Sequence, residues 1–364
     1  MKQIIIAHFY QPGTAATNRI IAYAKSFASL GQEVTLVLGY NQINPLLDLD
    51  GVDVKVVTAP CHSLLVPNIA MEVKRLYTNK TSILVYGSPL LCLFLPKSKY
   101  RIFYECTEIP LYGRPKGVAI RIKEAFKMYL AKRASGMLVI SQALRDFFYK
   151  KGVTKIEVVN MFVDATRFEI QDKEKNIKYI AYCGTVSPFK DGVDCLIKAF
   201  EIFNKKHTEY RLKIIGRFES PDAESIVRNL ARDLGLSDCI DFTGIVMPDE
   251  MPELLLGASM LALARPNNRQ AQFGFPTKLG EYLATGNPVV VTNVGEIGVF
   301  LHDGENCRMA RPGDAEDFAE KMIWVAENPE ASKIIGAKGK ELTRTEFSAV
   351  EQSKKALTFM NTIR

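Results

Sequence analysis

The sequence predicts an α/β protein made of two Rossmann-like, doubly wound domains facing a cleft. Apolar runs of four to six residues alternate with amphipathic segments along the whole chain, which is typical of β-α-β units and parallel sheets. The alternation starts again after a polar stretch at 164–175, and 364 residues suit two domains better than one. We therefore predict domains at 1–165 and 166–345, followed by a segment at 346–364 that contains a last amphipathic helix.

The first half begins with the apolar run Ile-Ile-Ile-Ala, which is typical of a first β-strand. Further short apolar runs predict the following strands, and longer amphipathic stretches predict the helices between them. The expected strands are 3–8, 33–38, 52–57, 82–86, 101–104, 137–140 and 156–159, and the expected helices include 15–30, 66–78, 119–132 and 143–150.

The second half repeats this pattern. Its helix at 277–285 has the clearest boundaries, because Pro276 and Thr277 suit a first helical turn, Gly286 suits the cap and Pro288 prevents continuation. The expected strands are 178–182, 212–215, 240–242, 259–263 and 288–291, and the expected helices are 192–206, 222–235, 249–257, 277–285, 315–327 and 348–362.

Composition excludes several classes of protein. A hydrophobic content of 47% with 24% charged residues is typical of a globular chain, not of a disordered one. The first apolar run is too short for a signal peptide, and no run reaches the length of a membrane span. The seven cysteines are scattered without a CxxC pair, which favours buried thiols in a reducing cytoplasm, and the four histidines show no metal-site spacing. We expect no metal.

Charge is unevenly distributed along the chain. The formal net charge is +7, but residues 1–165 hold 21 of the 47 lysines and arginines and only 11 of the 40 acidic residues. A basic first half indicates an anionic substrate or surface as its partner. Nucleic acid would also suit such charge, but no recognition motif accompanies it.

The segment 273–292 carries the strongest chemical signal. Lys278 and Glu281 are three residues apart near the start of the expected helix, so they share one face. A cation beside unpaired backbone N–H groups suits a phosphate, and a carboxylate one turn later can bind a ribose diol. An ordinary surface ion pair is an equally good interpretation of these two residues alone.

Two further strand-to-helix turns contain glycine. Gly13 and Thr14 follow the first strand, where backbone N–H groups could approach a ligand, although a plain β–α turn is an equal alternative. Gly184 ends a strand of the second half, and Lys190 precedes the next helix. A lysine held there could neutralise a diphosphate leaving group, whereas a solvated lysine is the simpler alternative.

These motifs together resemble the retaining glycosyltransferases of family 4, which have the GT-B fold. The resemblance rests on Gly184 with Lys190-Asp-Gly-Val, on Ile215-Gly216, on Asp241-Phe-Thr-Gly, on Ala264-Arg-Pro and on Lys278-Leu-Gly-Glu-Tyr-Leu-Ala-Thr-Gly-Asn-Pro. It continues into the first half through Val139-Ile-Ser-Gln-Ala-Leu-Arg and covers almost the whole chain.

The resemblance implies roles for individual residues. Glu281 matches the family's ribose-binding glutamate, Lys190 the lysine on the donor diphosphate, and Gly13 and Thr14 the loop near the diphosphate and the sugar. The last helix is expected to cross back onto the first domain. The complete expected nucleotide-sugar site consists of Gly13, Thr14, Gly184, Thr185, Lys190, Gly216, Arg217, Arg265, Phe273, Gly274, Phe275, Pro276, Thr277, Lys278 and Glu281.

Two positions depart from the family pattern. Thr185 stands where the family commonly has an arginine, and Phe273 stands where it commonly has a second glutamate. The diphosphate thus has one cation fewer unless Arg217, Arg265 or Lys278 compensates. The donor sugar would contact Phe273 and neighbouring backbone N–H groups instead of a carboxylate.

Two acidic residues of the first half are candidate catalytic groups. Glu105 and Glu108 are expected just after a strand, where a carboxylate could orient or deprotonate an acceptor hydroxyl. Both could equally be solvated loop acids or helix caps. The Asp48-Leu-Asp50 sequence resembles a metal-binding pair but is interpreted as surface. The chemistry implied by the resemblance needs neither a metal nor another cofactor.

The stretch 114–133 is rich in basic and apolar residues. Arg121, Lys123 and Lys127 are candidates to face an anionic membrane from an interfacial helix. A core-packed helix with a basic outer face is an equal alternative. Peripheral attachment to the inner face of the membrane would accompany a cytoplasmic location.

The sequence therefore predicts a retaining, metal-independent glycosyltransferase. Its donor would be a nucleotide-diphosphate sugar and its acceptor a glycan hydroxyl, in a lipid-linked glycan of bacterial surface polysaccharide synthesis. Two alternatives remain: a catalytically silent GT-B protein that binds glycan or acts as a scaffold, and a GT-B nucleotide-sugar epimerase.

Overall fold

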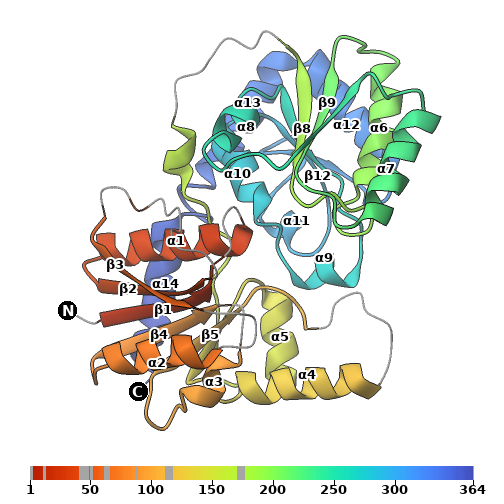
Figure 1. The fold of residues 1–364 in the computed structure, drawn as a ribbon. Coiled ribbons are helices and arrows are strands. Elements are labelled where there is room, and N and C mark those ends of the chain that lie inside the picture. Colours follow the sequence, from red (N-terminus) through yellow and green to blue (C-terminus); the bar gives the residue numbers. More distant parts are fainter. Residues whose placement is uncertain are drawn as a thin grey trace. The chain divides into compact units, whose positions relative to one another are not determined.

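The computed structural model describes residues 3–10, 14–40, 49, 52–60, 66–86, 89–110, 118–169 and 177–363 (Figure 1). The chain divides into two compact units. Unit 1 comprises Met1–Phe162 together with Ala349–Arg364, and unit 2 comprises Val163–Ser348.

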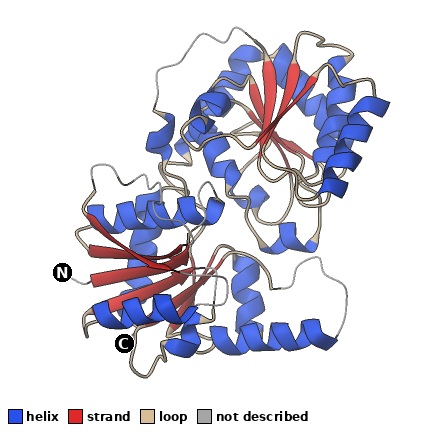
Figure 2. Cartoon of the chain, in the orientation of Figure 1, coloured by secondary structure: helices blue, strands red, loops and turns tan. Residues whose placement is uncertain are grey.

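Unit 1 is built on a seven-stranded sheet in which every described pairing is parallel (Figure 2). The strand order is β3-β2-β1-β4-β5-β6-β7, so the chain winds outward in both directions from β1. The strands are β1 (Gln3–Phe9), β2 (Glu33–Tyr40), β3 (Val54–Pro60), β4 (Thr81–Tyr86), β5 (Ile102–Cys106), β6 (Gly136–Val139) and β7 (Ile156–Val158).

Helices cover the sheet of unit 1. The last helix packs beside α1, although more than three hundred residues separate them in the sequence (Figure 1). The helices are α1 (Ala15–Ser29), α2 (Val66–Leu76), α3 (Leu91–Phe94), α4 (Val118–Ala131), α5 (Gln142–Lys150) and α14 (Ala349–Thr362).

The core between the sheet of unit 1 and helices α1 and α14 joins segments that are distant in sequence. Alternate residues of β1, among them Ile4 and Ile6, lie in one cluster with Phe27 of α1 and with Ala356 and Met360 of α14. All five are buried. Burial of such side chains stabilises a fold by roughly 1.5–3 kcal/mol each, so α14 is an integral part of the core.

A buried ion pair connects α1 with the middle of the sheet. The guanidinium of Arg19 lies 2.7 Å from Oε1 of Glu105, and the two side chains are 2% and 0% exposed. Tyr23 donates a hydrogen bond of 3.0 Å to the same oxygen. Burial alone would lower the pKa of the Arg19 guanidinium, but the charge of Glu105 raises that pKa well above its ordinary value. Arg19 is therefore charged inside the unit.

Arg19 also holds the segment where the chain leaves unit 1. It donates 3.0 Å hydrogen bonds to the carbonyl groups of Val159 and Asn160, and its guanidinium lies 4.1 Å from the ring centre of Phe162. The amide of Asn160 donates to Oε1 of Gln352, a residue of α14. One buried cation thus connects α1, β5 and the exit segment.

Unit 2 contains a six-stranded sheet of the same kind, again with parallel pairing throughout. Its strand order is β10-β9-β8-β11-β12-β13, which reverses direction between β8 and β11. The strands are β8 (Tyr179–Cys183), β9 (Arg211–Ile215), β10 (Ile240–Gly244), β11 (Met260–Leu263), β12 (Val289–Thr292) and β13 (Arg308–Ala310).

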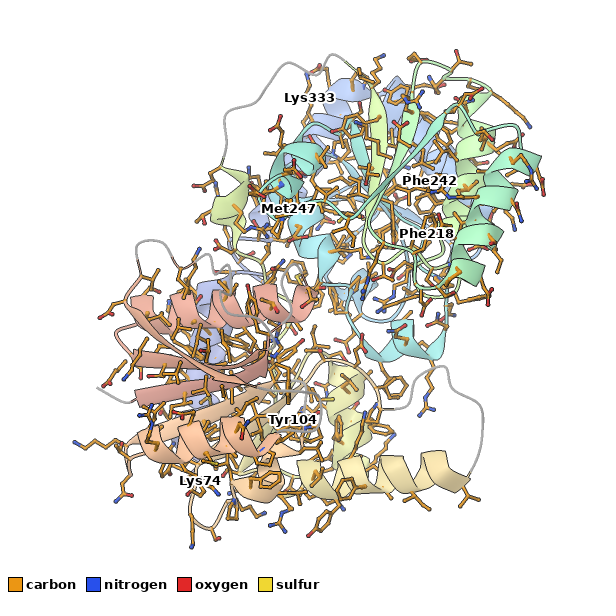
Figure 3. The ribbon with its side chains drawn as sticks, viewed as in Figure 1. Lys74, Tyr104, Phe218, Phe242, Met247 and Lys333 are labelled. Carbon is orange, nitrogen blue, oxygen red and sulfur yellow. The ribbon has the colours of Figure 1, made fainter. Side chains whose placement is uncertain are left out.

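The helices of unit 2 surround its sheet. Near α7 the rings of Phe218 and Phe242 lie 5.7 Å apart, with the guanidinium of Arg228 over both (Figure 3). The helices are α6 (Val193–Asn204), α7 (Pro221–Asp233), α8 (Met251–Leu256), α9 (Arg269–Phe273), α10 (Lys278–Thr285), α11 (Ile297–Phe300), α12 (Ala315–Glu327) and α13 (Pro329–Glu341), together with the 3-10 helix η1 (Ala165–Phe168).

The predicted fold class is confirmed, since both sheets are parallel and doubly wound. Each expected strand overlaps an observed one, and the expected helices are present with ends shifted by a few residues. Sequence reasoning missed α3, α9, α11, α13 and β13, and it treated η1 as part of a polar linker.

Within the described residues, no helix is long and apolar enough to cross a membrane. No group of three or more potential metal ligands occurs among the side chains that the structure describes. The cysteines in these ranges are free thiols, and all except Cys239 are buried, as expected; Cys61 lies outside the described residues, as do Asp48 and Asp50.

Breaking the Arg19–Glu105 pair should strongly destabilise the protein. Arg19→Met leaves the Glu105 carboxylate buried without its cation, so we expect the free energy of unfolding to fall by about 3–5 kcal/mol. Glu72→Gln, which removes the exposed pair with Arg75, is the control and should change it by less than about 0.5 kcal/mol. Urea unfolding measures both, and a loss for Arg19→Met as small as that of the control would contradict the assigned role.

His8 should make stability depend on pH. Burial lowers the pKa of this β1 side chain from 6.5 to about 4, although a backbone hydrogen bond with Tyr86 opposes the shift. The unfolded chain therefore binds a proton between these values that the folded chain does not, so stability falls as pH decreases through this range. We expect a loss of about 3 kcal/mol between neutral pH and pH 4.

His8→Gln should reduce this pH dependence, whereas His302→Gln, at an exposed position, should retain it. Urea unfolding at several pH values measures the difference. A His8→Gln protein with the same pH dependence as the parent would show that another group is responsible.

Candidate functional site

The residues expected to bind a ligand gather at the carboxyl edge of the sheet of unit 2. The loops after β8 and β11 meet there, on either side of the point where the strand order reverses. Gly192 has φ 69°, and a Cβ on it would overlap the carbonyl oxygen of Ala264. Only glycine permits this approach, and open parallel sheets bind ligands at such a reversal.

Two glycines allow the backbone segments after β8 and β9 to lie close together. Gly184 and Gly216 have φ values of 148° and 134°, and the Gly184 amide donates a 2.8 Å hydrogen bond to the carbonyl of Ile215. A Cβ on Gly216 would overlap the carbonyl of Gly184, and one on Gly184 would overlap Nζ of Lys278. The glycines therefore make room for the lysine at the strand ends.

Lys278 lies in a small buried network. Its Nζ lies 2.5 Å from Oδ2 of Asp191 and 3.2 Å from the hydroxyl of Tyr182, which is itself 3.0 Å from Asp191. Burial alone would raise the pKa of the Asp191 carboxyl, but the charge of Lys278 lowers it below the ordinary value. The Asp191 carboxylate thus fixes the Lys278 side chain at the ends of the strands.

The helix that carries Lys278 is fixed to β8. The backbone amide of Cys183 donates a 2.6 Å hydrogen bond to the hydroxyl of Tyr282, which donates back to the carbonyl of Cys183. Gly286 ends α10 in the left-handed conformation, with φ 77°, as the sequence predicts. Lys278 and Glu281 are thereby positioned relative to the end of the sheet.

Glu281 has a partner that sequence reasoning missed. Nη1 of Arg167, in η1, lies 3.0 Å from Oε1 of Glu281, and Nη2 donates a 3.0 Å hydrogen bond to the carbonyl of Pro248. The side chains are only 20% and 18% exposed. Arg167 lies 114 residues before its partner, so local sequence patterns give no signal for this pair.

Other expected residues lie in the same loops. Lys190 is half-buried just before α6, and its amide donates to the Ser187 side chain. Thr185 is half-buried, and its carbonyl accepts from Tyr182. Arg217 is exposed just beyond β9, while Arg265 is 4% exposed and follows β11. Cationic side chains from several strand ends thus belong to this edge of the sheet.

The segment 273–277 differs from the expected loop. Phe273 is the half-buried last residue of α9, which Asn268 caps. Phe275 is 6% exposed, and its ring packs against those of Phe300 and Phe347, at 5.8 and 5.5 Å. The Phe275 side chain is therefore a core residue. Gly274 and Pro276 are buried as well, whereas Thr277 is half-buried at the start of α10.

The candidate site residues of unit 1 lie in different surroundings. Gly13 lies outside the described residues, and Thr14 caps α1 by accepting from the amide of Thr17. The expected position of Glu105 after the strand is wrong: it lies within β5, fully buried, because its charge is paired with Arg19. Glu108 does lie in the following loop and is exposed.

The basic candidates of α4 are described only in part. The side chains of Arg121 and Lys123 lie outside the described residues, and Lys127 is half-buried. Apolar residues of the same helix are exposed, including Ile122 and Phe126.

Comparison with known sequences identifies the family of unit 2. Residues 177–328 match the family described as Glycosyl transferases group 1. An uncharacterised glycosyltransferase of Methanocaldococcus jannaschii is 25% identical over 250 residues, which are 63% of this chain and 66% of that protein. The D-inositol 3-phosphate glycosyltransferase of Corynebacterium aurimucosum is 28% identical over 151 residues, covering 40% of this chain and 34% of its own length. The matches therefore span less than two thirds of these relatives.

Solved structures share the fold over the whole length of the chain. HepE of Anabaena in complex with UDP-glucose aligns with a TM-score of 0.76 at 18% identity and covers 100% of both chains. A glycosyltransferase of Rickettsia africae aligns with a TM-score of 0.73 at 17% identity, covering 100% of this chain and 98% of its own. The architecture is that of the GT-B glycosyltransferases. Residues 177–328 of unit 2 match the glycosyl transferases group 1, the family 4 that the motifs of the sequence resemble.

Proposed function

We propose that this protein transfers a sugar from a nucleotide-diphosphate donor to a hydroxyl group of an acceptor, with retention of configuration. The observation that carries the proposal is the edge of unit 2 where Lys278 lies against Gly184, with Glu281 one turn further along α10. The match of residues 177–328 to the glycosyl transferases group 1 and the UDP-glucose bound by the structural neighbour HepE support it.

In this proposal, the positive charges at the strand ends bind the diphosphate. Lys190, in the loop before α6, and Lys278, at the start of α10, face the leaving group, and backbone N–H groups near Gly184 and Gly216 approach it closely. During transfer, the bond between the anomeric carbon and the phosphate oxygen breaks, a bond to the acceptor oxygen forms, and the proton of the acceptor hydroxyl passes to the departing diphosphate. Negative charge then grows on the diphosphate, where fixed cations stabilise it most effectively.

Glu281 accepts hydrogen bonds from the ribose hydroxyls, and Arg167 is its positioning residue. The 3.0 Å ion pair fixes one carboxylate oxygen, Oε1, and thereby the direction of the other. A carboxylate held in this way loses less conformational entropy when it binds a ligand than a freely rotating one. Because Arg167 also bonds to the carbonyl of Pro248, the arrangement does not depend on the nucleotide.

The acceptor is proposed to be a glycan, carried by a lipid in bacterial surface polysaccharide synthesis. The basic character of residues 1–165 suits an anionic carrier at a membrane surface. Glu108 is the better candidate to orient the acceptor hydroxyl because it is exposed, whereas the carboxylate of Glu105 is bound within the protein. The reaction is proposed to use no metal or other cofactor.

Glu281→Gln should weaken nucleotide binding by about tenfold or more, because hydrogen bonds to a charged acceptor contribute about 1.5–3 kcal/mol. Calorimetry with UDP and with 2′,3′-dideoxy-UDP separates the ribose contribution. The parent should lose affinity for the dideoxy nucleotide, whereas Glu281→Gln should bind the two about equally. Glu346→Gln is the control. Equal discrimination by Glu281→Gln and the parent would place the ribose elsewhere.

Lys190→Ala should mainly reduce turnover, by about a hundredfold, because its cation stabilises charge that develops during transfer. Product formation across a panel of nucleotide sugars and glycan acceptors measures this, with Lys198→Ala on α6 as the control. Nucleotide binding without turnover by the parent would favour a silent protein, interconversion of the donor sugar an epimerase, and no nucleotide binding would refute the site.

A further inference from the structure

Helices α3 and α4 of unit 1 expose an unusual amount of apolar surface. In α4, Val118, Ile122, Phe126 and Tyr129 follow one another at spacings of four, four and three residues, which places them along one face of the helix. Between 44% and 76% of each side chain is exposed. An apolar face of this kind normally packs against the core, whereas here it faces solvent.

Helix α3 continues this surface. It lies beside α4 (Figure 1), and the two are joined where Arg133 Nε donates to the carbonyl of Cys92 and Lys97 Nζ donates to that of Lys132. Leu90, Leu93 and Phe94 are each 36–37% exposed. We call these seven residues of α3, α4 and the turn before α3 the apolar surface: Leu90, Leu93, Phe94, Val118, Ile122, Phe126 and Tyr129.

The chain around the apolar surface is strongly basic. Residues 89–135 hold ten lysines and arginines and three acidic residues. One of these acids, Glu105, is already paired inside the unit. Lys97, Lys99 and Lys132 are exposed, and Arg133 reaches over the ring of Tyr129, to whose hydroxyl it donates a 2.9 Å hydrogen bond. Apolar side chains among cations, with a tyrosine at their border, are typical of surfaces that enter the headgroup region of a bilayer.

We propose that the apolar surface docks this protein on an anionic lipid bilayer. The aliphatic and aromatic side chains enter the interface, while the lysines and arginines contact lipid phosphates. Only the biological role of this membrane contact rests on the proposed function: the contact would bring a lipid-linked acceptor to the enzyme. A second copy of the chain is the less suitable occupant, because two such basic surfaces repel each other.

This surface extends the interfacial helix expected from sequence, because it includes Leu90, Leu93 and Phe94 of α3 and the turn before it. Arg121, Lys123 and Lys127 alone would give a purely electrostatic contact, which salt screens. Exposed Ile122 and Phe126 add an apolar contribution that salt does not weaken, so the bilayer contact should persist in part at high ionic strength.

The test is sedimentation of the full chain with vesicles of equimolar phosphatidylcholine and phosphatidylglycerol, and with vesicles of phosphatidylcholine alone. We expect binding to the anionic vesicles and at least about tenfold weaker binding to the neutral ones. Ile122→Ser combined with Phe126→Ser should reduce affinity for the anionic vesicles by about tenfold or more. Ile334→Ser, at an exposed position of α13, is the matched control and should bind as the parent does.

A second variant tests the charges. Lys97→Glu combined with Lys99→Glu should also reduce binding to anionic vesicles by about tenfold, because each nearby cation strengthens binding several-fold. The urea-unfolding transition of unit 1 should be unchanged in every variant, which shows that the variants are folded. UDP binding, measured on the same preparations, should also be unchanged, which separates this inference from the proposed activity.

Three results would overturn the proposal. They are failure of the parent to bind anionic vesicles, parental binding by the Ile122→Ser, Phe126→Ser protein, and concentration-dependent dimerisation of the parent that this variant abolishes. The last result would assign the apolar surface to a second copy of the chain. If the parent does not bind UDP, the proposed nucleotide site is wrong. The vesicle experiment still tests the apolar surface in that case.

Discussion

The candidate site depends on the parallel pairing of the six strands of unit 2. Parallel strands all end at the same edge, so the residues that follow β8, β9 and β11 gather there even though many other residues separate them. Because the strand order reverses between β8 and β11, the loops that follow these two strands lead away from each other. Gly192, in the loop after β8, allows close contact with Ala264, in the loop after β11. The chemistry at this edge is thus a result of sheet topology before it is a result of any single side chain.

Two ion pairs at this edge are formed between residues of unit 2. Asp191 is bound to Lys278, and Arg167 is bound to Glu281. Each partner fixes a side chain that a ligand would otherwise have to order, and removal of one partner would leave an uncompensated charge. A diphosphate and a ribose would therefore meet groups that are already oriented, and they would compete with or share the existing partners.

Local patterns were sufficient for most of the fold. The ends of α10 follow from Pro276, Gly286 and Pro288, and the central strands follow from their apolar runs. The missed elements have weak local signals: α9 and α11 are very short, and α13 buries Ser332, Gly336 and Gly339, which do not form an apolar stripe. Lys278 and Glu281 can be predicted as a candidate pair because they lie close together in sequence. The partners of Glu105 and Glu281 are 86 and 114 residues away, so only the folded chain reveals them.

The return of α14 to unit 1 has a consequence for synthesis of the chain. Met360 and Ala356 belong to the core beside α1, Arg101 donates a 2.6 Å hydrogen bond to the carbonyl of Met360, and Gln352 holds the exit segment at Asn160. These residues leave the ribosome only after all of unit 2 has been made. Unit 2, which is continuous in sequence, can fold first, while the earlier-made unit 1 waits with an incomplete core. The core of unit 1 can therefore be completed only after unit 2 has been synthesised, although most of unit 1 is made first.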